Sequence, residues 1–203
     1  MKRFLFTAVL VLASLFSKAY HSIDVSRHGE GPAIVVISGF GGSDAWEDVT
    51  LKLKENHTIH LVSIKGVSGK GETGDFMMQE VIDELVGYFK EQAFELPTVI
   101  GHSFGGFMAL QFASIHPDLV GKLVLVDFFP FSMALWNEAF TSEVGKQQSQ
   151  MYESQMVSMP QEKYAEFWKQ ILKGMVTSVE NQDALFNLIM GSDRQYIIKA
   201  QCA

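Results

Sequence analysis

The chain has 203 residues, of which 47% are hydrophobic and 12% are aromatic, and these are enough to form the core of one globular domain. Its formal net charge is −7 at pH 7. This charge argues against sequence-independent nucleic-acid binding, because such binding depends on clustered Lys and Arg. The chain has one cysteine, Cys202, so neither an internal disulfide nor a cysteine-based zinc site can form.

Residues 1–19 have the pattern of a secretory signal peptide. Two basic residues precede an apolar run over residues 4–16, and Ser17 and Ala19 put small side chains at the −3 and −1 positions of a cleavage site. The alternative is an uncleaved membrane anchor, but thirteen apolar residues are fewer than the roughly 20 that span a bilayer. We therefore predict an exported protein, periplasmic or secreted, with no stable membrane insertion after cleavage.

Residues 20–129 alternate candidate strands with candidate helices. The run over residues 33–38 is continuously apolar and β-branched, as in a strand covered on both faces. The predicted strands span residues 22–27, 33–38, 58–64, 98–101 and 122–127, and the predicted helices span residues 45–54, 76–90 and 105–115. Ser43 or Asp44 is expected to cap the first helix. This alternation predicts an α/β fold with a mostly parallel sheet and helices on both faces.

The predicted strands stop after Phe128, and the rest of the chain has the pattern of helices. An apolar stripe with a 3.6-residue period follows Pro160, which suits the first turn of a helix. The stripe consists of Tyr164, Phe167, Trp168, Ile171, Leu172 and Met175. Residues 192–195 are typical of a capping box that opens a last helix. The predicted organisation is a signal peptide (1–19), a core (20–129) and a helical cap or lid segment (130–203).

The five residues Gly101-His102-Ser103-Phe104-Gly105 match the pattern G-x-S-x-G. The match lies between a predicted strand and a predicted helix, which is the context that a nucleophile elbow requires. The glycines have a steric role, since residues without side chains let the strand and the helix pass closely. The sequence therefore predicts Ser103 as a nucleophile presented on a sharp turn.

A serine nucleophile also needs donors for the negative charge that develops on the substrate oxygen. The loop at residues 38–43, "SGFGGS", follows a predicted strand and is well placed to supply one. We expect the backbone N–H groups of Phe40 and Phe104 to form this oxyanion hole. The alternative is that the glycine-rich loop is a plain flexible turn.

Three stretches together resemble the α/β-hydrolase family: "VVISGFGGSDAW", "GHSFGGFMALQFASIHPDLVGKLVLVD" and a helical cap that begins at "FFPF". The resemblance implies an α/β-hydrolase core of the secreted or periplasmic bacterial type, with Ser103 as the nucleophile and oxyanion donors at Phe40 and Phe104. It also implies a small-molecule, apolar ester-like substrate and an esterase-like reaction with no cofactor and no metal.

In this family the catalytic acid usually follows a strand after the cap, and the histidine comes from a loop near the C-terminus. The resemblance therefore leads us to expect a C-terminally truncated copy that lacks the last strands of the fold, the late acid and the late histidine. Asp127 is the one candidate acid, although a strand-end residue that caps a loop is the favoured alternative. No histidine is expected to reach Ser103: His102 should diverge from it, and His116 lies at the far end of the helix.

Two functions follow from these patterns. The first is a serine hydrolase for a carboxylic ester or a related acyl bond, expected to be incomplete because the late acid and histidine are absent. The second is a non-catalytic, secreted pseudoenzyme that binds a small apolar ligand between cap and sheet. Residues 123–126, "LVLV", should form a strand buried on both faces, so its outer edge either stays open and invites self-association or is covered by the cap.

Overall fold

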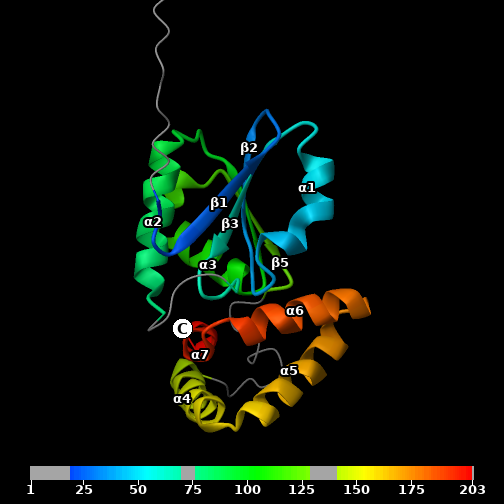
Figure 1. Cartoon of the computed structure of the whole chain (residues 1–203). Helices are drawn as coiled ribbons and strands as arrows, with labels where there is room; N and C mark the ends of the chain where they lie inside the picture. Colours follow the sequence, from blue (N-terminus) through cyan, green and yellow to red (C-terminus); the bar gives the residue numbers. More distant parts are fainter. Residues whose placement is uncertain (1–18, 70–75, 129–140, 203) are drawn as a thin grey trace, which may run out of the picture.

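The computed structural model describes residues 19–69, 76–128 and 141–202. The expected signal peptide, apart from Ala19, therefore lies outside the described residues, as does the start of the expected cap up to residue 140. The described chain forms a sheet with helices on both faces, and four further helices gather beyond one end of that sheet (Figure 1).

The sheet has five strands in the order β1-β3-β2-β4-β5. Four of them are parallel, and these are β2 (Ala33–Ile37), β3 (Thr58–Ile64), β4 (Thr98–His102) and β5 (Lys122–Val126). The remaining strand, β1 (Ile23–His28), pairs with β3 in the antiparallel direction. The predicted mostly parallel sheet is confirmed.

Three helices cover the faces of this sheet. Helices α2 (Met78–Glu91) and α3 (Phe104–Ile115) pack on one face, where they share the largest apolar core with the strands. Helix α1 (Glu47–Leu53) lies on the opposite face, where Trp46 packs on β2 and β3 (Figure 1). A single 3-10 turn, Pro117–Leu119, leads from α3 into β5.

The start of α1 differs from the prediction. A 3-10 turn, Ser43–Trp46, precedes the helix, and Gly42 and Trp46 stand at the two capping positions without a side-chain hydrogen bond. Neither Ser43 nor Asp44 therefore caps α1. The physical reason is that the chain enters through a tighter turn, which puts both residues inside the 3-10 segment.

Strand β5 is not buried on both faces, so that prediction was wrong. Leu123 and Leu125 pack toward the core beneath α3, but Val124 and Val126 on the other face are 42% and 40% exposed. Within the described residues β5 pairs with β4 alone, and the cap helices lie beyond the carboxyl ends of the strands rather than along this edge (Figure 1). Self-association through the edge stays a prediction.

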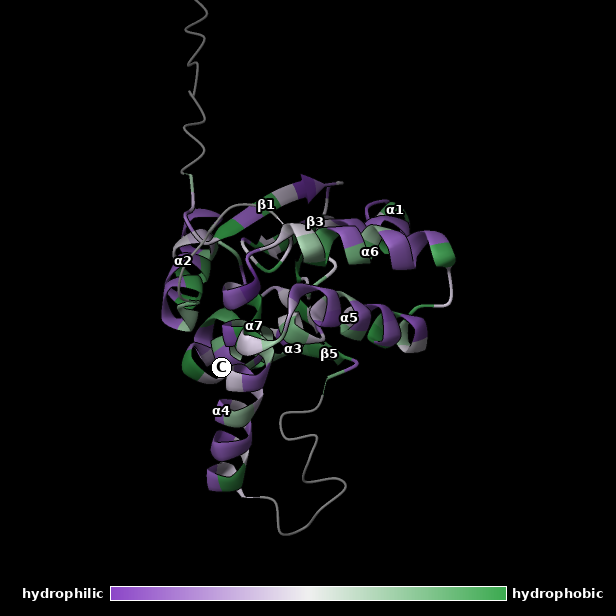
Figure 2. Ribbon diagram, turned by 60° about the horizontal axis from the view of Figure 1, so that its bottom comes forward, coloured by the Kyte–Doolittle hydropathy of each residue, from purple (hydrophilic) through white to green (hydrophobic). Residues whose placement is uncertain are grey.

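The cap contains α4 (Ser142–Ser158), α5 (Gln161–Met175), α6 (Val179–Gly191) and α7 (Arg194–Cys202). Each combines hydrophilic and hydrophobic residues, as helices that cover a shared core do (Figure 2). The predicted stripe supplies that core with Tyr164, Trp168 and Leu172. None of the described helices is long and apolar enough to cross a membrane.

Two of the cap helices begin differently from the prediction. Pro160 occupies the N-cap position of α5 instead of its first turn. At the start of α7 the capping residue is Asp193, whose Oδ1 accepts a 2.8 Å hydrogen bond from the Tyr196 N–H. Ser192 instead donates its hydroxyl to the Leu188 carbonyl at 2.8 Å and so belongs to the end of α6.

A buried histidine lies within strand β3. His60 is 3% exposed, and its Nδ1 lies 2.6 Å from the Tyr88 hydroxyl. Burial and, to a smaller extent, the charge of Arg27 lower the pKa of His60 to about 4. Burial likewise raises the pKa of Tyr88 to about 12. Both side chains are therefore neutral in the folded protein at pH 7.

This histidine should make the fold sensitive to mild acid. In the unfolded chain His60 regains its ordinary pKa of about 6.5, so between about pH 6.5 and 4 the unfolded chain binds more protons than the folded one. The free energy of unfolding should therefore fall as the pH is lowered through this range, by up to about 3 kcal/mol from His60. Urea unfolding at half-unit pH steps measures this slope.

The variant His60→Gln should lose this part of the pH dependence, whatever its stability at pH 7. The matched control is His28→Gln at the end of β1, a histidine substitution that leaves the buried contact between His60 and Tyr88 intact. Equal slopes in the parent protein and His60→Gln would contradict the assignment.

Candidate active site

Ser103 lies on the turn between β4, which ends at His102, and α3, which begins at Phe104. Its backbone has φ 53° and ψ −124°, a strained conformation for a residue with a side chain. Such strain persists only where the surroundings impose it. Here the Ser103 N–H donates to the Val126 carbonyl at 3.1 Å, and the Ser103 carbonyl accepts from the Gly106 N–H at 2.8 Å.

The glycines on both sides of this turn are required by close packing. A methyl group on Gly105 would overlap the Ile37 carbonyl, lying 2.7 Å from its carbon, and a methyl group on Gly101 would lie 2.7 Å from the Ala109 Cβ. The start of α3 thus rests directly on the backbone of β2. This close approach is the steric role that the sequence pattern predicts for the glycines.

The loop after β2 runs beside the turn. A Cβ atom on Gly39 would lie 3.2 Å from the Ser103 Cβ, and the rings of Phe40 and Phe104 are 5.5 Å apart. In the described part of the chain, neither the Phe40 N–H nor the Phe104 N–H has a hydrogen-bond acceptor. Phe104 is the first residue of α3, where the helix dipole favours negative charge. The oxyanion hole at Phe40 and Phe104 stays a prediction.

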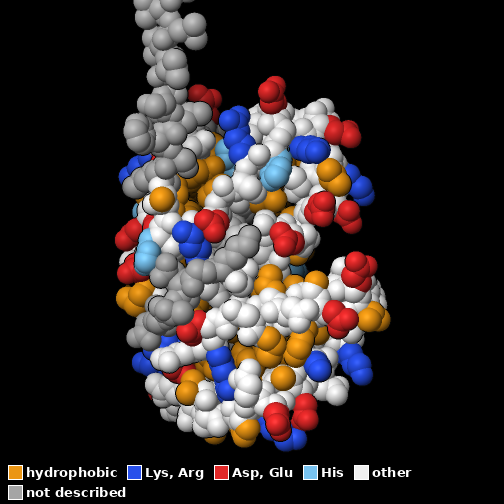
Figure 3. All heavy atoms as spheres, in the orientation of Figure 1, with side chains coloured by type: hydrophobic (Ala, Val, Ile, Leu, Met, Phe, Trp, Pro, Cys, Tyr) orange, Lys and Arg blue, Asp and Glu red, His pale blue; other side chains and the backbone are white. Residues whose placement is uncertain are grey.

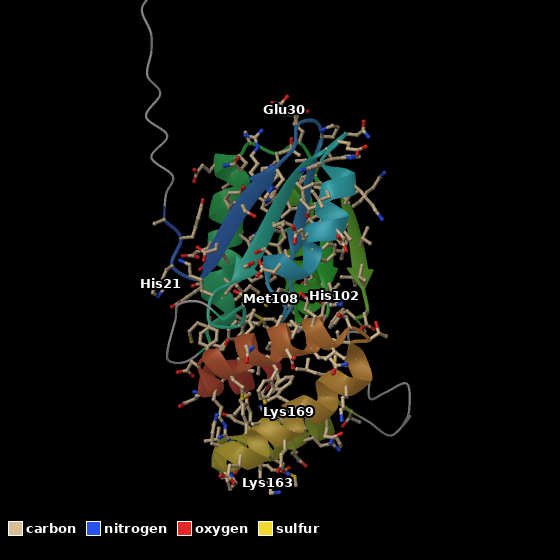
Figure 4. The ribbon with its side chains drawn as sticks, turned by 45° about the vertical axis from the view of Figure 1, so that its right-hand side comes forward. His21, Glu30, His102, Met108, Lys163 and Lys169 are labelled. Carbon is tan, nitrogen blue, oxygen red and sulfur yellow. The ribbon has the colours of Figure 1, made fainter. Side chains whose placement is uncertain are left out.

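Two other predicted site residues, His102 and Asp127, form no hydrogen bond with the Ser103 side chain. The His102 ring stacks edge-on against Trp46, with centroids 6.3 Å apart, at the boundary between sheet and cap (Figure 4). Asp127 follows β5 with φ 49°, is exposed, and has no hydrogen bond or ion pair to any described residue. Likewise, the Ser103 hydroxyl has no hydrogen-bond partner among the residues that the structure describes.

All six histidines lie within the described ranges, and none forms a hydrogen bond with Ser103. His60 is bound to Tyr88, and His116 follows the far end of α3 with its ring against Phe112. The described ranges also hold no cluster of three or more His, Cys, Asp or Glu side chains that could bind a metal ion.

Contacts between the cap and the loops beside Ser103 were not predicted. The Trp168 ring lies 6.3 Å from that of Phe40, and a Cβ atom on Gly41 would lie 3.3 Å from Leu185. A hollow on one side separates the sheet from the cap, with hydrophobic side chains beside it (Figure 3). The apolar stripe of α5 signals that Trp168 is buried, but only the folded chain reveals that it covers Phe40.

The strand-turn-helix geometry and the mostly parallel sheet define a hydrolase-type α/β protein. Residues 32–187 match the model of the alpha/beta hydrolase fold family. Because the match covers most of the sequence, the chain belongs to this family.

Curated relatives match about half of the chain. It is 29% identical over 116 residues to a pimeloyl-(acyl-carrier protein) methyl ester esterase of Aeromonas hydrophila, a match that covers 56% of this chain and 44% of the relative. It is 35% identical over 105 residues to the esterase of the same name in Aliivibrio salmonicida, which covers 50% of this chain and 38% of the relative. The chain thus matches less than half of the length of these relatives.

Solved structures share the fold at low sequence identity. An epoxide hydrolase variant from Bacillus megaterium has a TM-score of 0.69 at 13% identity, with 88% of this chain and 67% of that chain covered. A marine microorganism esterase has a TM-score of 0.53 at 21% identity, with 82% of this chain and 63% of that chain covered. These likenesses show the fold and no more.

The packing at Gly105 can be tested by adding one methyl group. Gly105→Ala should lower the free energy of unfolding by about 3 kcal/mol or more, because overpacking against a rigid backbone carbonyl cannot be relieved by a side-chain movement. Urea unfolding measures the loss. The matched control is Gly174→Ala in α5, where a Cβ atom meets nothing within 4 Å, so stability should be unchanged or raised by up to about 1 kcal/mol.

Proposed function

We propose that the protein is a serine hydrolase that acts on a carboxylic ester or a related acyl bond, with Ser103 as the nucleophile. One observation carries this proposal: Ser103 is held at φ 53° between strand and helix, next to the loop that contains Phe40. The N–H groups of Phe40 and Phe104 have no acceptor among the described residues. Membership of the hydrolase family and the ester-cleaving relatives support the same reaction class.

In this mechanism the Ser103 Oγ attacks the ester carbonyl carbon and forms a tetrahedral intermediate. The negative oxygen is bound by the N–H groups of Phe40 and Phe104, which need no rearrangement because neither has another described partner. Collapse of the intermediate breaks the ester bond, and the leaving oxygen takes up the proton lost by the Ser103 hydroxyl. The alcohol departs and an acyl group stays on Ser103. Water then hydrolyses this acyl-enzyme.

The cap favours an apolar acyl group in the substrate. Phe40 lies between Phe104 and Trp168, with ring centroids 5.5 Å and 6.3 Å away, and Leu185 of α6 approaches the same loop. Apart from the indole N–H of Trp168, these side chains carry no hydrogen-bonding group. The Trp168 Nε1 is buried and has no described partner. We therefore propose a small, apolar ester as the substrate.

The proton of the Ser103 hydroxyl needs a base. Asp127 is the candidate acid of the site, and it stands directly after Val126, whose carbonyl binds the Ser103 N–H. No described histidine forms a hydrogen bond with Ser103. We therefore propose that the described residues supply the nucleophile and the oxyanion hole but no efficient general base. Catalysis that rests on these two elements alone is slow.

Covalent labelling tests the nucleophile. A fluorophosphonate probe should label the protein slowly, and Ser103→Ala should abolish the labelling, since the probe reacts with an activated serine held beside an oxyanion hole. Mass spectrometry locates the label. The control is Ser114→Ala, because Ser114 is exposed on the same helix and bonds to the Gln111 carbonyl. Labelling that persists in Ser103→Ala would refute the assignment.

Added imidazole tests the base. Hydrolysis of p-nitrophenyl acetate should be slow and should rise at least about tenfold with imidazole, because a general base contributes about 100- to 10,000-fold when it is well placed. The increase is measured after subtracting the rate of Ser103→Ala at the same imidazole concentration. Fast hydrolysis that depends on Ser103 and does not respond to imidazole would instead mean that the chain has its own base.

A further inference from the structure

The segment that follows the predicted signal peptide is bound by a single carboxylate. Glu84 of α2 accepts hydrogen bonds from three consecutive backbone N–H groups, those of His21 at 2.6 Å, Ser22 at 2.8 Å and Ile23 at 3.1 Å. Hydrogen bonds to a charged acceptor are about twice as strong as neutral ones. The half-buried Glu84 therefore anchors the chain where β1 begins.

Tyr20 is held by separate contacts. Its hydroxyl donates to Glu91 at 2.7 Å, and its ring packs edge-on against Tyr88 with centroids 5.8 Å apart. Its carbonyl accepts a 2.5 Å hydrogen bond from the Lys65 Nζ. Among the described residues, these anchoring contacts begin at Tyr20.

Ala19 differs from the residues that follow it. It is exposed, and within the described ranges it makes no hydrogen bond. Every contact of the anchored segment belongs to Tyr20 or to a later residue, so a break before Tyr20 removes none of them. A break further along the chain would remove donors to Glu84 or the start of the buried Ile23, which is 1% exposed.

We propose that the Ala19–Tyr20 peptide bond is a cleavage site for a signal peptidase and that the Glu84 carboxylate is the binding site for the new N-terminal segment. In the reaction, water adds across the Ala19–Tyr20 amide. Its oxygen becomes part of the Ala19 carboxylate, and Tyr20 receives the proton that makes its nitrogen an amine. Small side chains at Ser17 and Ala19 suit such a peptidase.

Cleavage also creates a positive charge near the Glu84 carboxylate, which attracts it. The new α-amino group has an ordinary pKa of about 7.7 to 8.0 and is mostly protonated at pH 7. The His21 nitrogen is 2.6 Å from Glu84, and three backbone bonds separate it from the Tyr20 nitrogen, so the ammonium lies within about 7 Å of the carboxylate. Glu91 adds a second negative charge beside the Tyr20 side chain.

The first test is the mature N-terminus. The full chain, with its natural first residues, is expressed in a Gram-negative bacterium, and protein from the periplasmic fraction is sequenced from its N-terminus. The expected first residue is Tyr20. A mature chain that begins at any other residue, or exported protein that keeps residues 1–19, would overturn the proposal.

The second test is the anchor, measured on the chain that begins at Tyr20. Glu84→Gln should speed amide hydrogen exchange at His21, Ser22 and Ile23 by at least about tenfold and lower Tm by about 3 to 8 °C, because charge-assisted bonds are lost. The control is Glu95→Gln, an exposed carboxylate after α2 without a described partner. If the amides of His21, Ser22 and Ile23 exchange at the same rate in Glu84→Gln and in Glu95→Gln, Glu84 is not the binding site.

Discussion

The candidate site depends on how closely α3 packs on β2. At Gly105 the helix backbone lies against the Ile37 carbonyl, with no room for a side chain. This contact fixes where α3 starts and forces Ser103 into a positive φ, at a cost of about 1 to 3 kcal/mol that the surrounding packing must offset. It also brings the loop after β2 beside the turn, where a Cβ atom on Gly39 would lie 3.2 Å from the Ser103 Cβ.

Different helices serve function and stability in this fold. Helix α3 presents the serine, and α6 of the cap packs over the adjacent loops through Leu185. Helix α2 holds the opposite edge of the sheet, because Glu84 binds the start of β1 and Tyr88 pairs with the buried His60. The contacts of His60 and of the N-terminal segment are therefore separate from Ser103.

Much of the core was predictable because its signals are local. The apolar run at β3 matched its observed bounds, and the pattern around Ser103 placed the turn between strand and helix. The predictions failed where the burial of a residue depends on segments that are far away in the sequence. Strand β5 has the composition of a strand buried on both faces, yet Val124 and Val126 are exposed because no described element covers that face.

By itself the sequence determined the fold class and the position of Ser103, because hydrophobic periodicity and the steric needs of a tight turn act over neighbouring residues. Only the tertiary structure decided what surrounds that serine. The Phe40 ring meets Trp168 from far along the chain, and the Glu84 carboxylate meets the residues around Ser22 across the sheet edge. Such contacts depend on how packed elements meet in space, and no local pattern of residues encodes that arrangement.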